Sequence, residues 1–108
     1  MDRGKIREDF DAAVNMSASE LEAWLATKES RRVGFRRQGA TESVGHASGR
    51  TIVRILRTPE TDLDDEDYAH MRKVVGFVHR HRAQRPENIY TSRWRYSLMN
   101  WGHDPTKD

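Results

Sequence analysis

The chain contains no cysteine and no long apolar run, and each absence excludes a class of protein. Without Cys among 108 residues, disulfides, thiolate metal sites and cysteine nucleophiles are ruled out, and the composition suits a reducing compartment. No segment approaches the roughly 20 apolar residues that span a bilayer, and the N-terminus lacks the apolar core of a signal peptide. We therefore expect a cytoplasmic protein that does not enter a membrane.

No segment of the sequence shows a clear β-strand pattern, whereas apolar residues recur at helical spacing along the chain. A third of the residues are charged and 35% are hydrophobic, with a mean hydropathy of −0.95. This length can bury one core without metals or disulfides. The expected fold is all-α, with residues 1–108 forming a single domain of four to five helices.

Amphipathic periods and capping signals place the expected helices. Ser17 followed by Glu20 reads as a capping box for the second helix. Thr91 or Ser92 can cap the last one, on which Trp94, Leu98 and Trp101 share a face. The predicted ranges are 3–14, 18–27, 43–57, 65–83 and a short helix that follows residue 92.

The third of these helices has two possible starts, because Ser43 and Ser48 can each act as its N-cap. A start at Ser43 places Gly45 and Gly49 one turn apart on the helix, where they would let another backbone approach closely. A start at Ser48 leaves Gly45 in a loop. We favour the earlier start.

One internal segment of the chain carries no helical period. Residues 30–41 contain two Gly and four Arg, and we expect a basic loop there. Residues 1–4 and 104–108 are expected to fray.

Charge is distributed in bands along the chain. Counting Lys and Arg against Asp and Glu gives 4 against 7 in residues 1–30 and 7 against 1 in 31–57. The counts are none against 6 in 58–70 and 8 against 3 in 71–108. Most of the basic residues are Arg, whose planar guanidinium can bind phosphate or carboxylate with two hydrogen bonds. The bands are therefore compatible with a phosphate-containing partner. Ion pairs between bands of opposite charge could equally connect one helix to the next within the fold.

Two groups of residues are candidates for binding nucleic acid. The first flanks the basic loop, where arginines beside a helix start can contact phosphates. It consists of Arg31, Arg32, Arg36, Arg37, Arg50 and Arg54. The second lies on the last helix, where Arg95 and Tyr96 place a charge beside an aromatic ring.

Both groups also have a structural explanation. The arginines of the first group can equally form a solvated basic face, or a face that pairs with the acidic segment 60–67. Core packing explains Trp94 and Trp101 better than base stacking does.

Enzymatic and metal sites find little support. The five His residues lack the spacing of a compact metal motif, so no metal ligand and no cofactor is expected. No nucleophile elbow, Walker A loop or GxGxxG motif is present. We expect a protein that is not an enzyme.

Four segments of the chain resemble a known family. ELEAWL, SVGHASGR, DYAHMRKVVGFVHRH and RWRYSLMNWGHDP are similar to segments of the domain-of-unknown-function family DUF3140, and the similarity runs from about Phe10 to Lys107. Some members of that family are labelled DNA-binding proteins. The resemblance therefore implies a DNA-binding role, but it assigns no catalytic residue.

These observations predict a small module that binds nucleic acid, DNA rather than RNA, mainly through contacts between Arg and phosphate. The alternative is a helical protein-interaction or self-association domain in which the opposed charge blocks meet between chains. The sequence does not distinguish oligomeric states.

Overall fold

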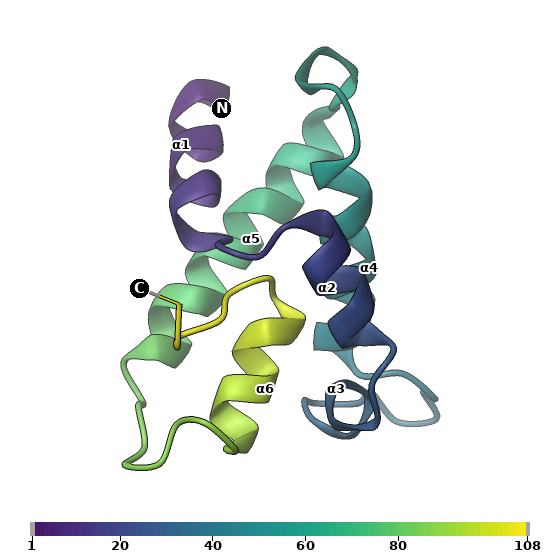
Figure 1. Ribbon diagram of the computed structural model, residues 1–108. Coiled ribbons are helices and arrows are strands. Elements are labelled where there is room, and N and C mark those ends of the chain that lie inside the picture. The colour runs from purple at the N-terminus through teal and green to yellow at the C-terminus, as the bar shows by residue number, and fades with distance from the viewer. Residues whose placement is uncertain (1, 108) are drawn as a thin grey trace.

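A computed structural model describes residues 2–107, and within this range all regular secondary structure is helical (Figure 1). The all-α prediction is therefore confirmed. The helices are α1 (Arg3–Ala13), α2 (Ala18–Leu25), α3 (Lys28–Arg32), α4 (Val44–Leu56), a short 3-10 helix η1 (Glu60–Asp62), α5 (Asp65–Arg82) and α6 (Arg93–Asn100). None of these helices combines the length and the apolar character that crossing a membrane requires.

The helix starts are set by side chains that satisfy unpaired backbone N–H groups. The Ser17 hydroxyl accepts from the Glu20 amide, and the Glu20 carboxylate accepts from the Ser17 amide, which confirms the predicted capping box. Asp64 and Asp67 form a second capping box at the start of α5. Ser92 caps α6 by accepting from the amide of Arg95.

One hydrophobic core joins the helices. Helix α1 packs along α5, while α2 packs on α4 and α6 lies between these two pairs (Figure 1). Phe10, Leu21, Ile52, Met71 and Leu98 are fully buried in this core and come from five different helices. The periodic apolar faces that the sequence predicted thus meet in one place.

Helix α4 begins at the earlier of the two possible caps, because the Ser43 hydroxyl accepts from the backbone amide of His46. Gly45 and Gly49 therefore lie one turn apart on α4, as predicted, and both face the end of α6. A Cβ atom at Gly49 would lie 2.6 Å from the carbonyl oxygen of Asn100, and one at Gly45 would lie 2.9 Å from Nε1 of Trp101. The two glycines allow α6 to approach α4 this closely.

Asn100 links α6 to α2 and α3 at the same point. Its Oδ1 accepts from Nε1 of Trp24 at 2.8 Å and from the Ser30 hydroxyl at 2.5 Å, and its Nδ2 donates to the Ser30 carbonyl at 3.0 Å. Asn100 and Ser30 are both buried. The polar atoms of the Asn100 side chain are thus all hydrogen-bonded in the interior, which fixes the relative positions of three helices.

The basic segment 30–41 differs from the predicted loop at its start. Lys28–Arg32 forms α3, which Thr27 caps by accepting from the amide of Ser30. The prediction missed this helix because five residues are too few to show an amphipathic period. Arg31 and Arg32 consequently lie on a helix, whereas Arg36 and Arg37 lie on the loop that follows it.

The expected fraying of residues 104–108 is wrong for the residues that the structure describes. Asp104 is buried, and its backbone amide donates to Oδ1 of Asn15 while the Asn15 amide group donates to its carbonyl. Lys107 donates to both carboxylate oxygens of Glu20. At the other end, Arg3 already begins α1. Met1 and Asp108, which belong to the two predicted frayed ends, lie outside the described residues.

We expect Gly49→Ala to destabilise the fold. The new Cβ would meet a backbone carbonyl and the side chain of Leu25, and this overpacking outweighs the better helix propensity of Ala. The free energy of unfolding should fall by about 1–3 kcal/mol, as measured by urea denaturation followed by circular dichroism.

Gly4→Ala is the matched control, because Gly4 lies in α1, where an added Cβ would be 3.6 Å from the nearest atom. This variant should be neutral or slightly stabilised. Equal effects of the two substitutions would contradict the close approach at Gly49.

Candidate nucleic-acid interface

The three arginines of α4 and its C-terminus are each bound to a carboxylate of the same chain. These pairs tie α4 to α2, to α5 and to the residue before its own N-cap. They are Arg50 with Glu42, Arg54 with Asp67 and Arg57 with Glu22, with closest N–O distances of 2.6, 2.5 and 2.8 Å. Arg54 thus contacts the acidic segment 60–67, as the alternative explanation of this basic group anticipated.

Glu42 has the most strongly perturbed environment of these carboxylates. Hydrogen bonds from the Arg50 guanidinium lower the pKa of Glu42 from 4.5 to about 2, and the contact with His46 acts in the same direction. Nδ1 of His46 lies 2.5 Å from Oε2 of Glu42, and its Nε2 donates to the Leu25 carbonyl at 2.7 Å. Glu42 therefore serves to join the loop before α4 to α4 itself.

The second predicted group is also used inside the molecule. Both Arg95 and Asp104 are largely buried, and their closest N–O distance is 3.1 Å. Burial alone would raise the pKa of Asp104, but hydrogen bonds from Arg95 and Thr106 outweigh it and lower that pKa. Tyr96 packs against Trp24 with a ring-centroid distance of 5.3 Å. Arg95 is therefore used within the fold, and the ring of the half-buried Tyr96 contacts Trp24.

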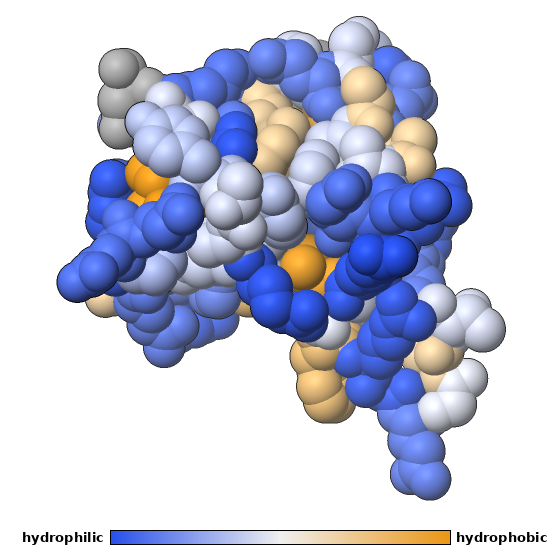
Figure 2. Space-filling model, turned by 60° about the horizontal axis from the view of Figure 1, so that its bottom comes forward, coloured by the Kyte–Doolittle hydropathy of each residue, from blue (hydrophilic) through white to orange (hydrophobic). Residues whose placement is uncertain are grey.

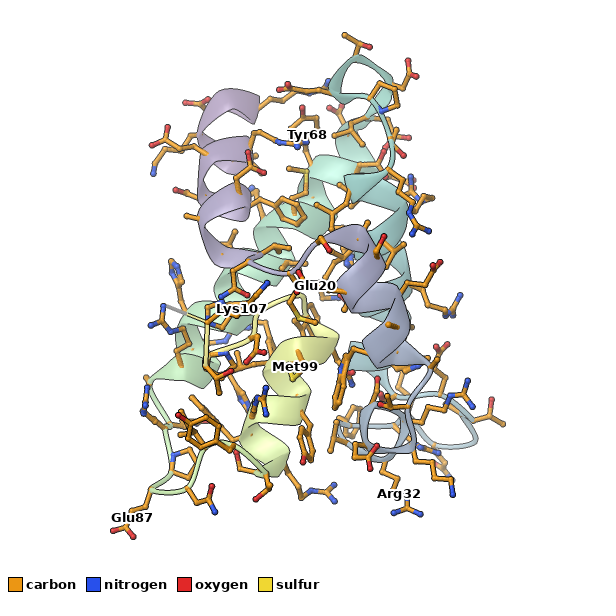
Figure 3. All side chains as sticks on the ribbon, viewed as in Figure 1. Glu20, Arg32, Tyr68, Glu87, Met99 and Lys107 are labelled. Atoms are coloured by element: carbon orange, nitrogen blue, oxygen red, sulfur yellow. The ribbon has the colours of Figure 1, made fainter. Side chains whose placement is uncertain are left out.

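The arginines around the loop have a different environment. Within residues 2–107, none of Arg31, Arg32, Arg36 and Arg37 forms an ion pair. The Arg36 guanidinium donates to the carbonyls of Thr41 and Arg31 and so closes the loop. Hydrophilic residues cover most of this end of the molecule, with small hydrophobic areas between them (Figure 2). Arg32 projects away from the body there (Figure 3).

Gly34 and Phe35 of the loop line one side of a groove, and residues of α4, α5 and α6 line the rest of it. The groove has a volume of about 230 Å³, and a neighbouring depression of about 210 Å³ shares Val44, Lys73 and Trp101 with it. Three cations line this combined surface, namely Arg37 from the loop and Lys73 and Arg80 from α5. No Asp or Glu of the described chain lines either part. The surface is therefore positively charged and locally uncompensated.

Aromatic rings form the floor of the groove. Phe77 of α5 stacks on Trp101 with 4.3 Å between the ring centroids and an interplanar angle of 13°. His70 stacks on Trp101, while His81 stacks on Phe77 and is followed by Trp94. The series of rings therefore runs His70, Trp101, Phe77, His81 and Trp94, and it connects α5 to both ends of α6.

A larger depression, of about 460 Å³, lies between α1 and α5. Asp2, Asp9, Lys5 and Arg72 all line it, and Lys5 is paired with Asp9. Its charges compensate one another, so this depression offers no selective site for an anion.

The histidines do not assemble a metal site. Among residues 2–107, no three His, Asp or Glu side chains converge in an arrangement that could hold a metal ion. His70 lies at the edge of the groove with its Nε2 2.9 Å from the Ser48 hydroxyl. Burial, together with the positive charges of Lys73 and Arg54, lowers the pKa of His70.

The family model described as "Protein of unknown function (DUF3140)" matches residues 9–99. The chain belongs to the DUF3140 family. This match confirms the resemblance seen in the sequence. Neither a curated protein nor a solved structure matches the chain significantly.

In this DUF3140 protein, sequence reasoning missed the half of the candidate interface that α5 contributes. Lys73, Phe77 and Arg80 follow one another at steps of four and three, which places them along one side of the helix. That stripe was visible in the sequence, but the basic residues near the end of α5 were explained by the helix dipole. Phe35 gave no signal, because one aromatic residue in a loop has no period.

We expect Glu42→Gln to destabilise the DUF3140 fold in a pH-dependent way. The folded-state pKa of Glu42 lies below its ordinary value, so the stabilisation is present above about pH 4.5 and is lost as the pH falls towards 2. At neutral pH the free energy of unfolding should fall by about 1 kcal/mol, because solvent screens this partly exposed pair. The difference from wild type should shrink as the pH is lowered.

Glu87→Gln is the matched control, since Glu87 is exposed and projects from the lower end of the molecule (Figure 3). Urea denaturation at several pH values should show no pH-dependent loss for this variant. A constant difference between Glu42→Gln and wild type across the acid range would contradict the assigned role of Glu42.

Proposed function

We propose that this protein is a cytoplasmic, non-enzymatic module that binds nucleic acid, DNA in preference to RNA, through phosphate contacts. The observation that carries the proposal is the groove with its neighbouring depression, which is lined by Arg37, Lys73 and Arg80 and by no carboxylate of the described chain. Arg31 and Arg32 of α3 precede the loop that carries Arg37, and both side chains are exposed. The residues proposed to contact phosphates are Arg31, Arg32, Arg37, Lys73 and Arg80.

This set revises the one expected from the sequence. Arg50, Arg54 and Arg95 are left out because their carboxylate partners would have to be displaced before a phosphate could bind. Arg36 is assigned to closing the loop, since both of its terminal nitrogens donate to backbone carbonyls. Cations that remain solvated and unpaired can instead exchange bound counterions for phosphates, and this gives affinity without sequence selectivity.

Two features favour binding over catalysis. The Ser48 hydroxyl lies near Nε2 of His70, as in a nucleophile and its base, but Ser48 is buried. Asp67, one turn before His70 on α5, is bonded to Arg54. The contact between Ser48 and His70 is thus explained as a hydrogen bond that joins α4 to α5.

The proposed location rests on composition. The lack of Cys in the sequence supports a reducing, cytoplasmic location.

The alternative, self-association through opposed charge blocks, is disfavoured by how those blocks are used. Arg3 pairs with Asp65, Arg54 with Asp67 and Lys107 with Glu20, all within one chain. Charges that are paired within a chain contribute little to steering a second copy.

Light scattering over a salt series separates the two functions. We expect a constant mass at all salt concentrations, because no charge-matched contact between chains is proposed. A mass that falls as salt is added would favour self-association instead.

For nucleic-acid binding, we expect a fluorescein-labelled DNA to bind at low salt with an affinity that falls as salt is added. Lys73→Gln should weaken this binding and lower the slope of log affinity against log salt by about one unit, as expected for one lost phosphate contact. The measurement is fluorescence anisotropy over a salt series.

Lys5→Gln is the matched control. It removes the same charge from a lysine that pairs with Asp9 on α1, so the slope should stay at the wild-type value. Absence of binding at low salt, or binding that does not respond to salt, would refute the proposed function.

A further inference from the structure

The groove has features that phosphate binding alone does not require. Its floor is aromatic, formed by the stacked rings of Phe77 and Trp101. Its volume of about 230 Å³ is below the roughly 300–1,000 Å³ of sites for drug-sized ligands. A single planar ring system fits these dimensions better than a larger ligand does.

Phe35 stands at the edge of this groove with 72% of its surface exposed. Its backbone is nevertheless held in place. Gly34 adopts a φ of 93°, which favours glycine, and the Phe35 carbonyl accepts from the Val44 amide at 2.8 Å. Arg36 closes the loop on the other side. The backbone of the loop is therefore held in place, and it carries an exposed aromatic side chain beside an aromatic floor.

Cations flank the same groove along α5. Lys73 and Arg80 are seven residues apart, which corresponds to about 10 Å along the helix axis, and Phe77 lies between them. Neither cation forms an ion pair within the described chain. A ligand that fills the groove with a flat, uncharged ring would thus have a positive charge on each side of that ring.

We propose that the groove receives an unpaired base of a single-stranded nucleic acid, which stacks on Phe35 while Lys73 and Arg80 contact the phosphates on either side. This inference rests on the proposed function and narrows it to single strands. Alternation of a planar base with flanking phosphates is the chemistry that this arrangement of rings and charges complements. In a duplex the bases are paired and stacked, so a base must first be extruded to reach such a groove.

The test compares three labelled probes by fluorescence anisotropy: an oligothymidine strand, an abasic strand of the same length, and the duplex of oligothymidine with oligoadenosine. The wild-type protein should bind the oligothymidine strand more tightly than the other two. Phe35→Ala should weaken binding of oligothymidine by about tenfold, as expected for one lost stacking contact. Its affinity for the abasic strand should not change.

Two variants serve as controls for Phe35→Ala. Phe35→Trp keeps an aromatic ring and should retain the preference for oligothymidine. Tyr90→Ala removes the other large exposed aromatic side chain, which lies outside the groove, and should leave all three affinities unchanged.

The outcomes separate this inference from the proposed function. Equal affinity for oligothymidine and the abasic strand, or equal loss on both in Phe35→Ala, would overturn base insertion while leaving phosphate binding intact. Absence of binding to all three probes would refute both proposals. A polyglutamate peptide that competes as well as oligothymidine would show that the groove takes an acidic protein segment, and this would also overturn the inference.

Discussion

The approach of α6 to α4 at Gly49 is the constraint on which the rest of the structure depends. Because no Cβ separates the two helices there, Asn100 reaches the interior and bonds to Trp24 and Ser30. These bonds hold α2 and α3 against α6, and the next residue, Trp101, stacks on Phe77 of α5. One close backbone contact thus helps to position three other helices, α2, α3 and α5, and also builds the floor of the candidate groove.

The charges of this protein divide into two sets with different consequences. One set forms ion pairs that connect helices, such as Arg54 with Asp67 and Arg57 with Glu22. Exposed pairs of this kind add little stability individually, but they neutralise the arginines that take part. The other set, around the basic loop and along α5, lacks carboxylate partners in the described chain. An anionic ligand would meet this second set without first having to break an ion pair.

The candidate interface depends on the fold at three separate places. The loop after α3 carries Arg37 and Phe35, α5 carries Lys73 and Arg80, and the end of α6 supplies Trp101. Hydrogen bonds of the loop backbone and the stacked rings hold these parts in position before any ligand arrives. Such preorganisation lowers the entropy that binding would otherwise cost.

The amino-acid sequence by itself determined the all-α class and the helix start at Ser17, and it narrowed two further starts to Ser43 or Ser48 and to Thr91 or Ser92. It favoured Ser43, the start that places Gly45 and Gly49 one turn apart on α4. These features depend on local hydrogen bonds, on helical periodicity and on the absence of a side chain, all of which act over a few residues. It did not reveal α3, which is too short for a period, or the order in residues 104–107. Only the tertiary structure decided which arginines are neutralised and that Phe35, Lys73 and Trp101 share a groove. The physical reason is that ion pairs and grooves join residues far apart in the chain, and their partners depend on how the helices pack.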